Sequence, residues 1–394
     1  MSSDSLWHTG RCTACGGTEL RDFLSVLGVP TQDGVLWNTQ TEALAAPKGD
    51  FILSVCQRCA YIGNRAYDAS LVTFEGYDVS LEHSPVFRDY LQALAAQLVD
   101  RYQLRHKKVL EIGVGKGLFL RTLCRLGNNQ GIGYDPSVRP ELRDQWLAEN
   151  VRIVPDFFSE KYATSDADMV SCRQVLDLLD QPKQFLQMLA RSLGPSTVLY
   201  FESPNGDGTL QDCVLWSMVY EHCSWFTLEG ARSLFNACGF DVLRAGPAFG
   251  TDYIGIEARP SARGAHLEPN AERVQAVLKD VTIFEQKQRE TLARWTAQLA
   301  TYQQQGKRVL PWGAGARAIA FLSAFAIKDA IPYVIDINPN RQGKYLPGTG
   351  QRVMAPAFVA EYAPDVVLIT NPSFCEEIKA QTRALGVSPE FQTL

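Results

Sequence analysis

The run Val109–Leu120, VLEIGVGKGLFL, combines the residue types that a ligand-binding turn requires. An apolar strand is followed by Gly113, Gly115 and Gly117 and then by an apolar segment with helical character. Glycines lack a Cβ, so such a turn can adopt positive φ and bring a ligand into contact with the backbone. Free N–H groups at the start of the following helix would favour a polar ligand there. These residues predict a buried strand, a tight turn and a helix around a binding site.

An acid follows this turn at the end of the next strand. The glycine spacing is G-x-G-x-G, whereas dinucleotide folds usually have G-x-G-x-x-G, and Glu111 ends the first strand. This pattern resembles the first motif of class I S-adenosylmethionine methyltransferases. The run 131–137 then ends a second strand with Asp135, placed to accept hydrogen bonds from two ribose hydroxyls. We predict that Glu111, the three glycines, Asp135 and Pro136 bind the cofactor S-adenosylmethionine.

Two further strand ends complete the predicted cofactor site. Val151–Phe158 can place Asp156 and Phe157 beside an adenine, with the acid accepting a hydrogen bond from its amine. A fourth predicted strand runs into a loop that begins with Arg173 and Gln174. Ligands of doubly wound sheets bind at the carboxyl ends of the strands. We therefore assign all four residues to the same site.

The strongest candidate for catalysis is a histidine beside an acid. His222 directly follows a carboxylate, Glu221, and Tyr220 and Trp225 flank the pair. An imidazole of near-neutral pKa is a natural general base, and an adjacent acid can tune it or act with it. We count Tyr220 with the candidate catalytic residues. The alternative is a structural histidine packed under aromatic rings.

Four of the ten cysteines form two identical pairs, which indicate a metal site. Cys12 and Cys15, and Cys56 and Cys59, each have the C-x2-C spacing. Four thiolates can surround Zn²⁺ as a tetrahedron with no open position, which makes a structural site. Metal binding would supply folding free energy to a segment too small for a good core of its own. The alternative is four reduced, unligated thiols; the other six cysteines are expected to be packing residues.

Length and composition exclude several classes of protein. A chain of 394 residues has room for two or three domains. Its net charge of −5 gives no electrostatic reason to expect nucleic acid or an anionic membrane as partner. No apolar run reaches the length of a membrane span, and the N-terminus lacks the features of a signal peptide. We expect a cytoplasmic protein, a monomer or a weak homo-oligomer, that acts on a small molecule.

The alternation of strands and helices predicts an α/β protein with a doubly wound sheet of the class I methyltransferase type. A polar helical run from Glu268 to about Gln305 reads as a connector. The segment Gly306–Phe325 then repeats the strand, glycine turn and helix. Gly313 and Gly315 with Arg317 could receive a phosphate, or this smaller unit could be purely structural. The predicted domains are a zinc-binding domain (1–75), a cofactor-binding methyltransferase domain (76–258), a helical connector (259–305) and a Rossmann-like domain (306–394).

Together these parts resemble one family, the deoxysugar C-methyltransferases that act on nucleotide-linked 4-keto sugars. The resemblance rests on the four-cysteine segment, the YEH run Tyr220–His222, the C-terminal GxGA turn and the run Gly343–Gly348, GKYLPG. It implies a base that removes the proton α to a ketone, after which the enolate carbon attacks the sulfonium methyl in line. By position, Glu221 and His222 fall on the family's Glu-His pair, and Tyr77 falls on an aromatic residue near the sugar.

The chain departs from that family at residues that would contact the acceptor. Val219 stands where the family commonly has tyrosine, and Leu178 stands where it commonly has histidine. The stretch between the cysteine pairs also lacks the usual pattern, and its Trp37–Thr39 either lines a substrate mouth or packs onto the next domain. The first hypothesis is therefore C-methylation of a keto sugar or related natural-product intermediate. The alternatives are O- or N-methylation of another small molecule, with His222 still the base, and a zinc-ribbon binding protein with a vestigial cofactor fold.

Overall fold

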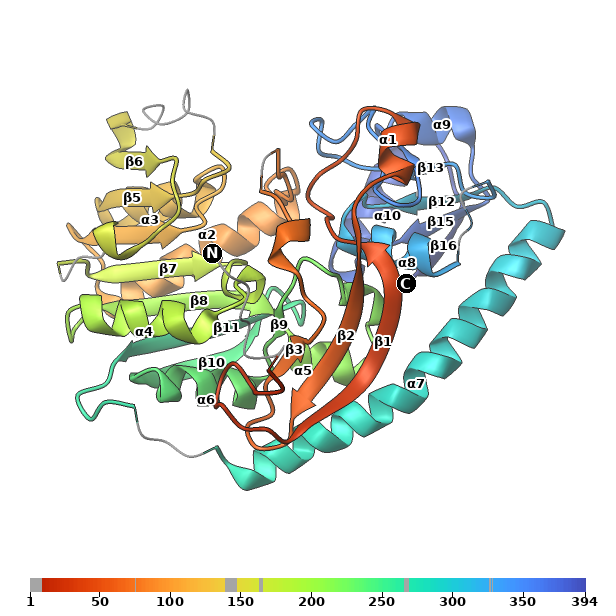
Figure 1. Cartoon of the computed structure of the whole chain (residues 1–394). Helices are drawn as coiled ribbons and strands as arrows, with labels where there is room; N and C mark the ends of the chain where they lie inside the picture. Colours follow the sequence, from red (N-terminus) through yellow and green to blue (C-terminus); the bar gives the residue numbers. More distant parts are fainter. Residues whose placement is uncertain are drawn as a thin grey trace.

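The computed structural model describes residues 9–74, 76–138, 147–162, 166–265, 269–325, 327 and 329–394. Three β-sheets organise this part of the chain, and one long helix connects the second sheet to the third (Figure 1). Within the described ranges, no helix combines the length and the apolar character that crossing a membrane would require.

The central sheet has seven strands, as a doubly wound fold predicts. They are β4 (Lys108–Ile112), β5 (Gln130–Tyr134), β6 (Val151–Val154), β7 (Met169–Arg173), β8 (Val198–Pro204), β10 (Phe240–Ala248) and β11 (Tyr253–Pro260). Their spatial order is β10-β11-β8-β7-β4-β5-β6, and β11 alone of these seven runs antiparallel to its neighbours. The order reverses beside β4, where a doubly wound sheet binds its ligand. This arrangement confirms the predicted class I methyltransferase fold.

Helices cover both faces of the central sheet. They are α2 (Pro85–Tyr102), α3 (Leu118–Gly127), α4 (Pro182–Ser192) and α6 (Leu228–Ala237). The short helix α5 (Gly206–Gln211) packs instead against the long helix that follows β11. Alternate strand residues point to opposite faces, so Val109 joins the core under α2 and α3, whereas Leu110 joins the core under α4 and α6. The turns between elements include η1 (Ala69–Leu71), η3 (Leu147–Glu149), η4 (Glu160–Tyr162), η5 (Leu176–Leu178), η6 (Leu215–Ser217) and η7 (Pro372–Phe374).

The N-terminal sheet includes a strand from the middle of the chain. It consists of β1 (Leu20–Pro30), β2 (Lys48–Cys56), β3 (Ile62–Asn64) and β9 (Ser224–Trp225) in that order. Strand β9 pairs Trp225 with Ile62 and Ser224 with Gly63. The segment that follows His222 therefore belongs to the N-terminal sheet.

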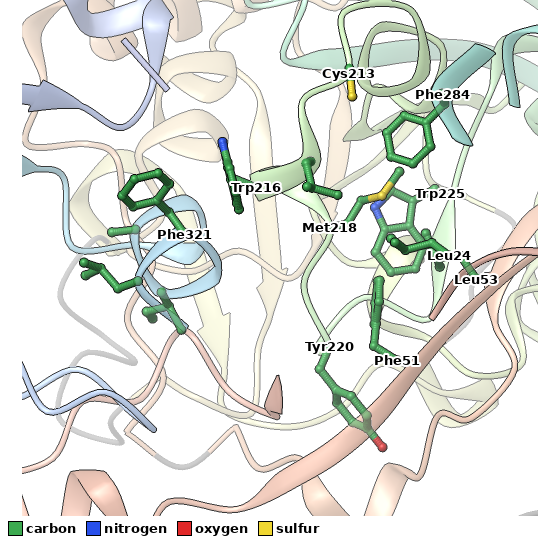
Figure 2. Packing of buried hydrophobic residues seen from close by; sticks show 14 of the residues in the cluster. Leu24, Phe51, Leu53, Cys213, Trp216, Met218, Tyr220, Trp225, Phe284 and Phe321 are labelled. Carbon is green, nitrogen blue, oxygen red and sulfur yellow. The ribbon is translucent and has the colours of Figure 1, made fainter. Parts of the chain in front are cut away.

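The connector is the helix α7 (Ala271–Gln304), which lies beside β1 (Figure 1). This agrees with the predicted helical run, although Glu268 lies outside the described residues. A buried cluster joins α7 to the N-terminal sheet, with Phe284 edge-on to Phe23 at 5.9 Å. In the same cluster Trp225 is edge-on to Phe51 at 5.2 Å (Figure 2). The connector thus shares a core with the N-terminal segment.

The C-terminal sheet is wholly parallel, as its Rossmann-like pattern predicts. Its strands are β12 (Val309–Trp312), β13 (Tyr333–Ile335), β14 (Arg352–Met354), β15 (Val366–Ile369) and β16 (Glu390–Thr393), and its helices are α8 (Ala316–Phe325), α9 (Phe358–Tyr362) and α10 (Cys375–Ala384). The order is β14-β13-β12-β15-β16. Gly313, after β12, has φ +107°, and a Cβ there would lie 2.3 Å from Thr370 Oγ1. Only glycine fits this turn without rearrangement.

The stretch between the cysteine pairs packs onto the C-terminal unit. Trp37 and Tyr345 exchange backbone hydrogen bonds of 3.1 and 2.8 Å. Thr39 caps the short helix α1 (Gln40–Leu44), and the N–H of Gly348 donates to the carbonyl of Ala43 at 2.7 Å. Of the two roles predicted for Trp37–Thr39, the structure therefore favours packing, although the partner is the GKYLPG run rather than the next domain.

Candidate active site

A cavity of about 1420 Å³ lies where the central sheet, the C-terminal sheet and two N-terminal loops meet. Predicted cofactor residues that line it are Glu111, Gly113, Gly115, Asp135, Pro136, Phe157, Arg173 and Gln174. Of the predicted catalytic residues, His222 and Tyr77 line it as well. The remaining candidates, Gly117, Asp156, Tyr220 and Glu221, are not among its lining residues. The structure thus brings most of the predicted site together around one space.

The glycine turn after β4 has a close side-chain contact on one side and open space on the other. Gly113 has φ +72°, and a Cβ there would lie 2.1 Å from the side chain of Val175. Gly115 has φ +52°, and a Cβ there would meet nothing within 4 Å. The turn is therefore closed behind Gly113 and open toward the cavity at Gly115, as a backbone that contacts a ligand requires.

The carboxylate of Asp135 is held by the protein itself. Its Oδ2 accepts from the N–H of Gly115 at 2.8 Å, and its Oδ1 accepts from the N–H and hydroxyl of Ser137 at 2.8 and 2.6 Å. A carboxylate offers about four acceptor positions, so capacity remains for a ribose hydroxyl. Asp135 fixes the glycine turn, and its contact with ribose stays a prediction.

Several buried polar side chains lie around Glu111 at the end of β4. Glu111 is 2% exposed, and its Oε2 has no hydrogen-bonding partner among the described residues. Arg173 donates to Glu202 at 2.9 Å and lies over the Phe119 ring, while Gln174 donates to Glu202 at 3.2 Å. A buried acceptor without a partner fits a cationic group such as the ammonium of S-adenosylmethionine. These residues could hold the amino-acid end of that cofactor.

We expect cofactor binding to release a proton at Glu111. Burial raises the pKa of Glu111 to about 8, so this carboxyl is mostly protonated at pH 7. An ammonium group bound beside it favours the ionised form, and affinity should therefore rise with pH between about 6 and 8. Titration of S-adenosylhomocysteine at pH 7 in buffers of different ionisation enthalpy measures the release. The variant Glu111→Gln should bind S-adenosylhomocysteine more weakly and release no proton. If the binding enthalpy of the wild-type protein did not depend on the buffer, the assignment of Glu111 would be contradicted.

Of the two residues predicted to contact adenine, only Phe157 lines the cavity. Phe157 is 61% exposed and lines the cavity, 6.5 Å from the ring of Phe74. Asp156 instead accepts hydrogen bonds from Lys161 at 2.6 Å and Tyr162 at 2.7 Å. The structure therefore does not bring Asp156 to the cavity, because two neighbours on the next turn hold its carboxylate.

The partner of His222 is Asp177, which the sequence did not single out. His222 Nε2 lies 3.4 Å from Asp177 Oδ2, and Nδ1 has no hydrogen-bonding partner among the described residues. Asp177 lies in η5, is 1% exposed and lines the cavity with His222. Burial raises the pKa of Asp177, although His222 opposes this effect. The pair can accept a proton and stabilise the resulting imidazolium.

Glu221 and its neighbour His222 contact different groups. Its Oε1 accepts from the N–H groups of Asp33 and Gly34, the latter at 3.0 Å. Tyr77 packs against the same loop, where a Cβ on Gly34 would lie 2.2 Å from the Tyr77 ring. Burial raises the pKa of both Glu221 and Tyr77, and each is raised further by nearby carboxyls that include Asp33. The acid adjacent to His222 in sequence therefore secures the loop under Tyr77.

Tyr220 lies outside the site. Its hydroxyl accepts from the N–H of Asp68 at 2.8 Å, and its ring stacks on Tyr67 with centroids 5.5 Å apart. Figure 2 shows it in the buried cluster beside Phe51. The structure therefore assigns Tyr220 to the packing of the N-terminal sheet, because consecutive side chains of this segment point in different directions.

The four paired cysteines converge as the spacing predicts. All four sulfurs lie within 4.8 Å of one another, with Cys12 to Cys59 at 3.7 Å and Cys15 to Cys56 at 3.6 Å. Zinc–sulfur bonds of about 2.3 Å in a tetrahedron place sulfurs roughly 3.8 Å apart. Gly16 and Ala60, one residue past each pair, have positive φ. The donors and their spacing fit a four-coordinate metal; its identity as zinc stays a prediction.

Comparisons with known proteins agree with this geometry. Residues 86–245 match a family model described as a methyltransferase domain, and residues 266–388 match one described as a C-methyltransferase C-terminal domain. The C-methyltransferase NovU of Streptomyces niveus is 24% identical over 388 residues, covering 93% of this chain and 90% of that protein. A ubiquinone biosynthesis O-methyltransferase of Xanthomonas oryzae pv. oryzae is 28% identical over 165 residues, or 40% of this chain and 63% of that protein.

A similar solved structure is the magnesium protoporphyrin IX methyltransferase of Synechocystis PCC 6803, with bound S-adenosylhomocysteine. It has a TM-score of 0.35 and 16% identity and covers 45% of this chain and 84% of that one. The chain is an S-adenosylmethionine-dependent methyltransferase. Within that class, the match along nearly the whole chain and the C-terminal family model support C-methylation.

Proposed function

We propose that this enzyme methylates a carbon α to a carbonyl group, with His222 as the general base. The observation that carries the proposal is the placement of the His222–Asp177 pair in the same cavity as the glycine turn. A base beside the cofactor site is what carbon methylation needs, because an α-carbon becomes nucleophilic only after it loses a proton. The name of the C-methyltransferase relative adds support for carbon as the acceptor atom.

The residues around the cavity have complementary roles in this proposal. Bound S-adenosylmethionine would supply the electrophilic methyl group. The His222 imidazole takes the α-proton, and the Asp177 carboxylate 3.4 Å away stabilises the imidazolium. Burial keeps Tyr77 in its neutral form, so its hydroxyl can donate a hydrogen bond to the enolate oxygen as charge develops. Glu221 positions Tyr77 through the loop at Gly34.

The proposed acceptor is a nucleotide-linked keto sugar or a related natural-product intermediate. The cavity exceeds the usual size of a single small-molecule site, about 300–1,000 Å³, and therefore has room for a cofactor and a large acceptor. Its C-terminal wall includes Gly313, Gly315 and Lys344, whose backbone and ammonium groups suit a phosphate. Arg317, predicted for the same role, is engaged by Asp252 at 2.9 Å.

Product analysis separates this proposal from O- or N-methylation. Candidate keto sugars and other carbonyl acceptors would be incubated with ¹³C-methyl-labelled S-adenosylmethionine, and the product examined by NMR. A labelled methyl on a carbon adjacent to the carbonyl is expected. A label on oxygen or nitrogen would favour the alternative, in which the same base activates a heteroatom. Exchange of the acceptor's α-proton in D₂O, dependent on His222, would support the proposed first step.

A further inference from the structure

A single carboxylate, Asp78, collects hydrogen bonds from both sides of the cavity. From the methyltransferase side, Lys116 Nζ lies 3.2 Å from Oδ2 and 3.3 Å from Oδ1. From the C-terminal unit, Asn338 Nδ2 donates to Oδ1 at 3.1 Å and Asn340 Nδ2 donates to Oδ2 at 2.9 Å. Arg341 also donates to the backbone carbonyl of Asp78 at 2.7 Å. The side chain of Asp78 is only 21% exposed.

Each donor belongs to a segment that borders a glycine turn. Lys116 lies between Gly115 and Gly117, the residues that must keep positive φ for the first turn to remain open. Asn338 follows Asp336, whose carboxylate accepts from the N–H of Ala314 in the second turn at 2.9 Å. Asp78 therefore connects the two turns through one acceptor.

We propose that Asp78 is a positioning residue that couples the C-terminal unit to cofactor binding, an inference that rests on the proposed cofactor site at the glycine turn. The C-terminal donors hold the Asp78 carboxylate in place, and the carboxylate in turn holds Lys116 and the turn around it. Asp135 secures the same turn through the N–H of Gly115. Loss of a C-terminal donor should then loosen the turn without touching the cofactor.

A second carboxylate provides a matched comparison. Asp252 precedes β11 and also joins the methyltransferase sheet to the C-terminal unit, with Arg317 at 2.9 Å and Asn371 at 3.0 Å. Like Asp78, it accepts from both a cationic and an amide side chain. Among the residues that the structure describes, none of its hydrogen bonds reaches the glycine turn after β4. If Asp78 served only to attach the C-terminal unit, substitutions at Asp78 and at Asp252 would change the cofactor affinity equally.

The test measures S-adenosylhomocysteine affinity by calorimetry in the full-length protein. Asp78→Ala and Asn340→Ala are each expected to weaken binding, by roughly fivefold and threefold, the scale of partly exposed charge and amide contacts. In the Asp78→Ala background, Asn340→Ala should have no further effect, because the carboxylate to which Asn340 Nδ2 donates is gone. Asp78→Asn should weaken the affinity, whereas the matched variant Asp252→Asn should leave it within twofold of wild type. Thermal unfolding of each variant gives its stability.

The possible results distinguish the proposed coupling through Asp78 from the proposed cofactor site at the glycine turn. Equal effects of Asn340→Ala in both backgrounds, or none in either, would overturn the coupling while leaving the cofactor site in place. Equal weakening by Asp252→Asn and Asp78→Asn would also overturn it, because attachment alone would then explain the loss. Absence of binding to the wild-type protein would overturn both proposals.

Discussion

Replacement of His222 by alanine is expected to lower turnover by about 10²-fold or more and to leave cofactor affinity unchanged. A positioned general base contributes on the order of 10²–10⁴ to rate. His222 lies against Asp177 on the wall of the cavity, whereas the cofactor contacts proposed above come from the ends of β4, β5 and β7. Steady-state turnover, with S-adenosylhomocysteine affinity measured separately, checks both parts of the prediction.

Two further variants make the His222 prediction specific. Asp177→Asn keeps the shape of the partner but removes its charge, so it should lower turnover less than His222→Ala does. His83 is the matched control, because it is another histidine of the cavity wall and its Nε2 lies 3.5 Å from the Lys116 ammonium. His83→Ala should retain turnover within a few fold. If it caused the larger loss while His222→Ala remained near normal, the base would be His83.

Local patterns were sufficient to predict the strands and the glycine turn of the proposed cofactor site. The glycine turn, the acid one strand later and the strands between them depend on residues that are close in sequence. The structure accordingly forms β4, β5 and β7 where strands were predicted, and the Asp135 carboxylate accepts from the turn. The antiparallel hairpin of β10 and β11 went unpredicted, although Gly250, with φ +65°, lies in its turn.

Contacts between distant segments account for what the sequence did not reveal. Adjacency in sequence suggested Glu221 as the partner of His222, yet consecutive side chains diverge when the next residues form a strand, here β9. Asp177 offered one signal, because it is the acid of the apolar run VLDLL next to Leu178, where the related family has histidine. No signal in the sequence pointed to Asp33, because Asp33 and Glu221, which are in contact, lie 188 positions apart in the chain.

Loss of the four-cysteine metal site is expected to impair catalysis more than cofactor binding. Cys59 and Ala60 lead directly into Tyr61 and β3, and β3 pairs with β9, two residues beyond His222. The Tyr61 hydroxyl is also hydrogen-bonded to that of Ser224 in β9. A structural zinc site supplies apparent binding free energy on the order of 10 kcal/mol. Without it the β3–β9 contact should loosen and the His222 ring should lose its position.

The variant Cys59→Ser should therefore lose its metal and at least tenfold in turnover, while S-adenosylhomocysteine affinity changes less than threefold. Elemental analysis, kinetics and calorimetry measure the three quantities. Cys238→Ser is the matched control, because Cys238 is buried in the same hydrophobic cluster as Cys59 but lies outside the four sulfurs. Full turnover in metal-free protein would show that His222 needs no support from this sheet. An equal loss of cofactor affinity would instead mean that the metal stabilises the central sheet as a whole, through the core that Cys12, Cys56 and Cys59 share with it.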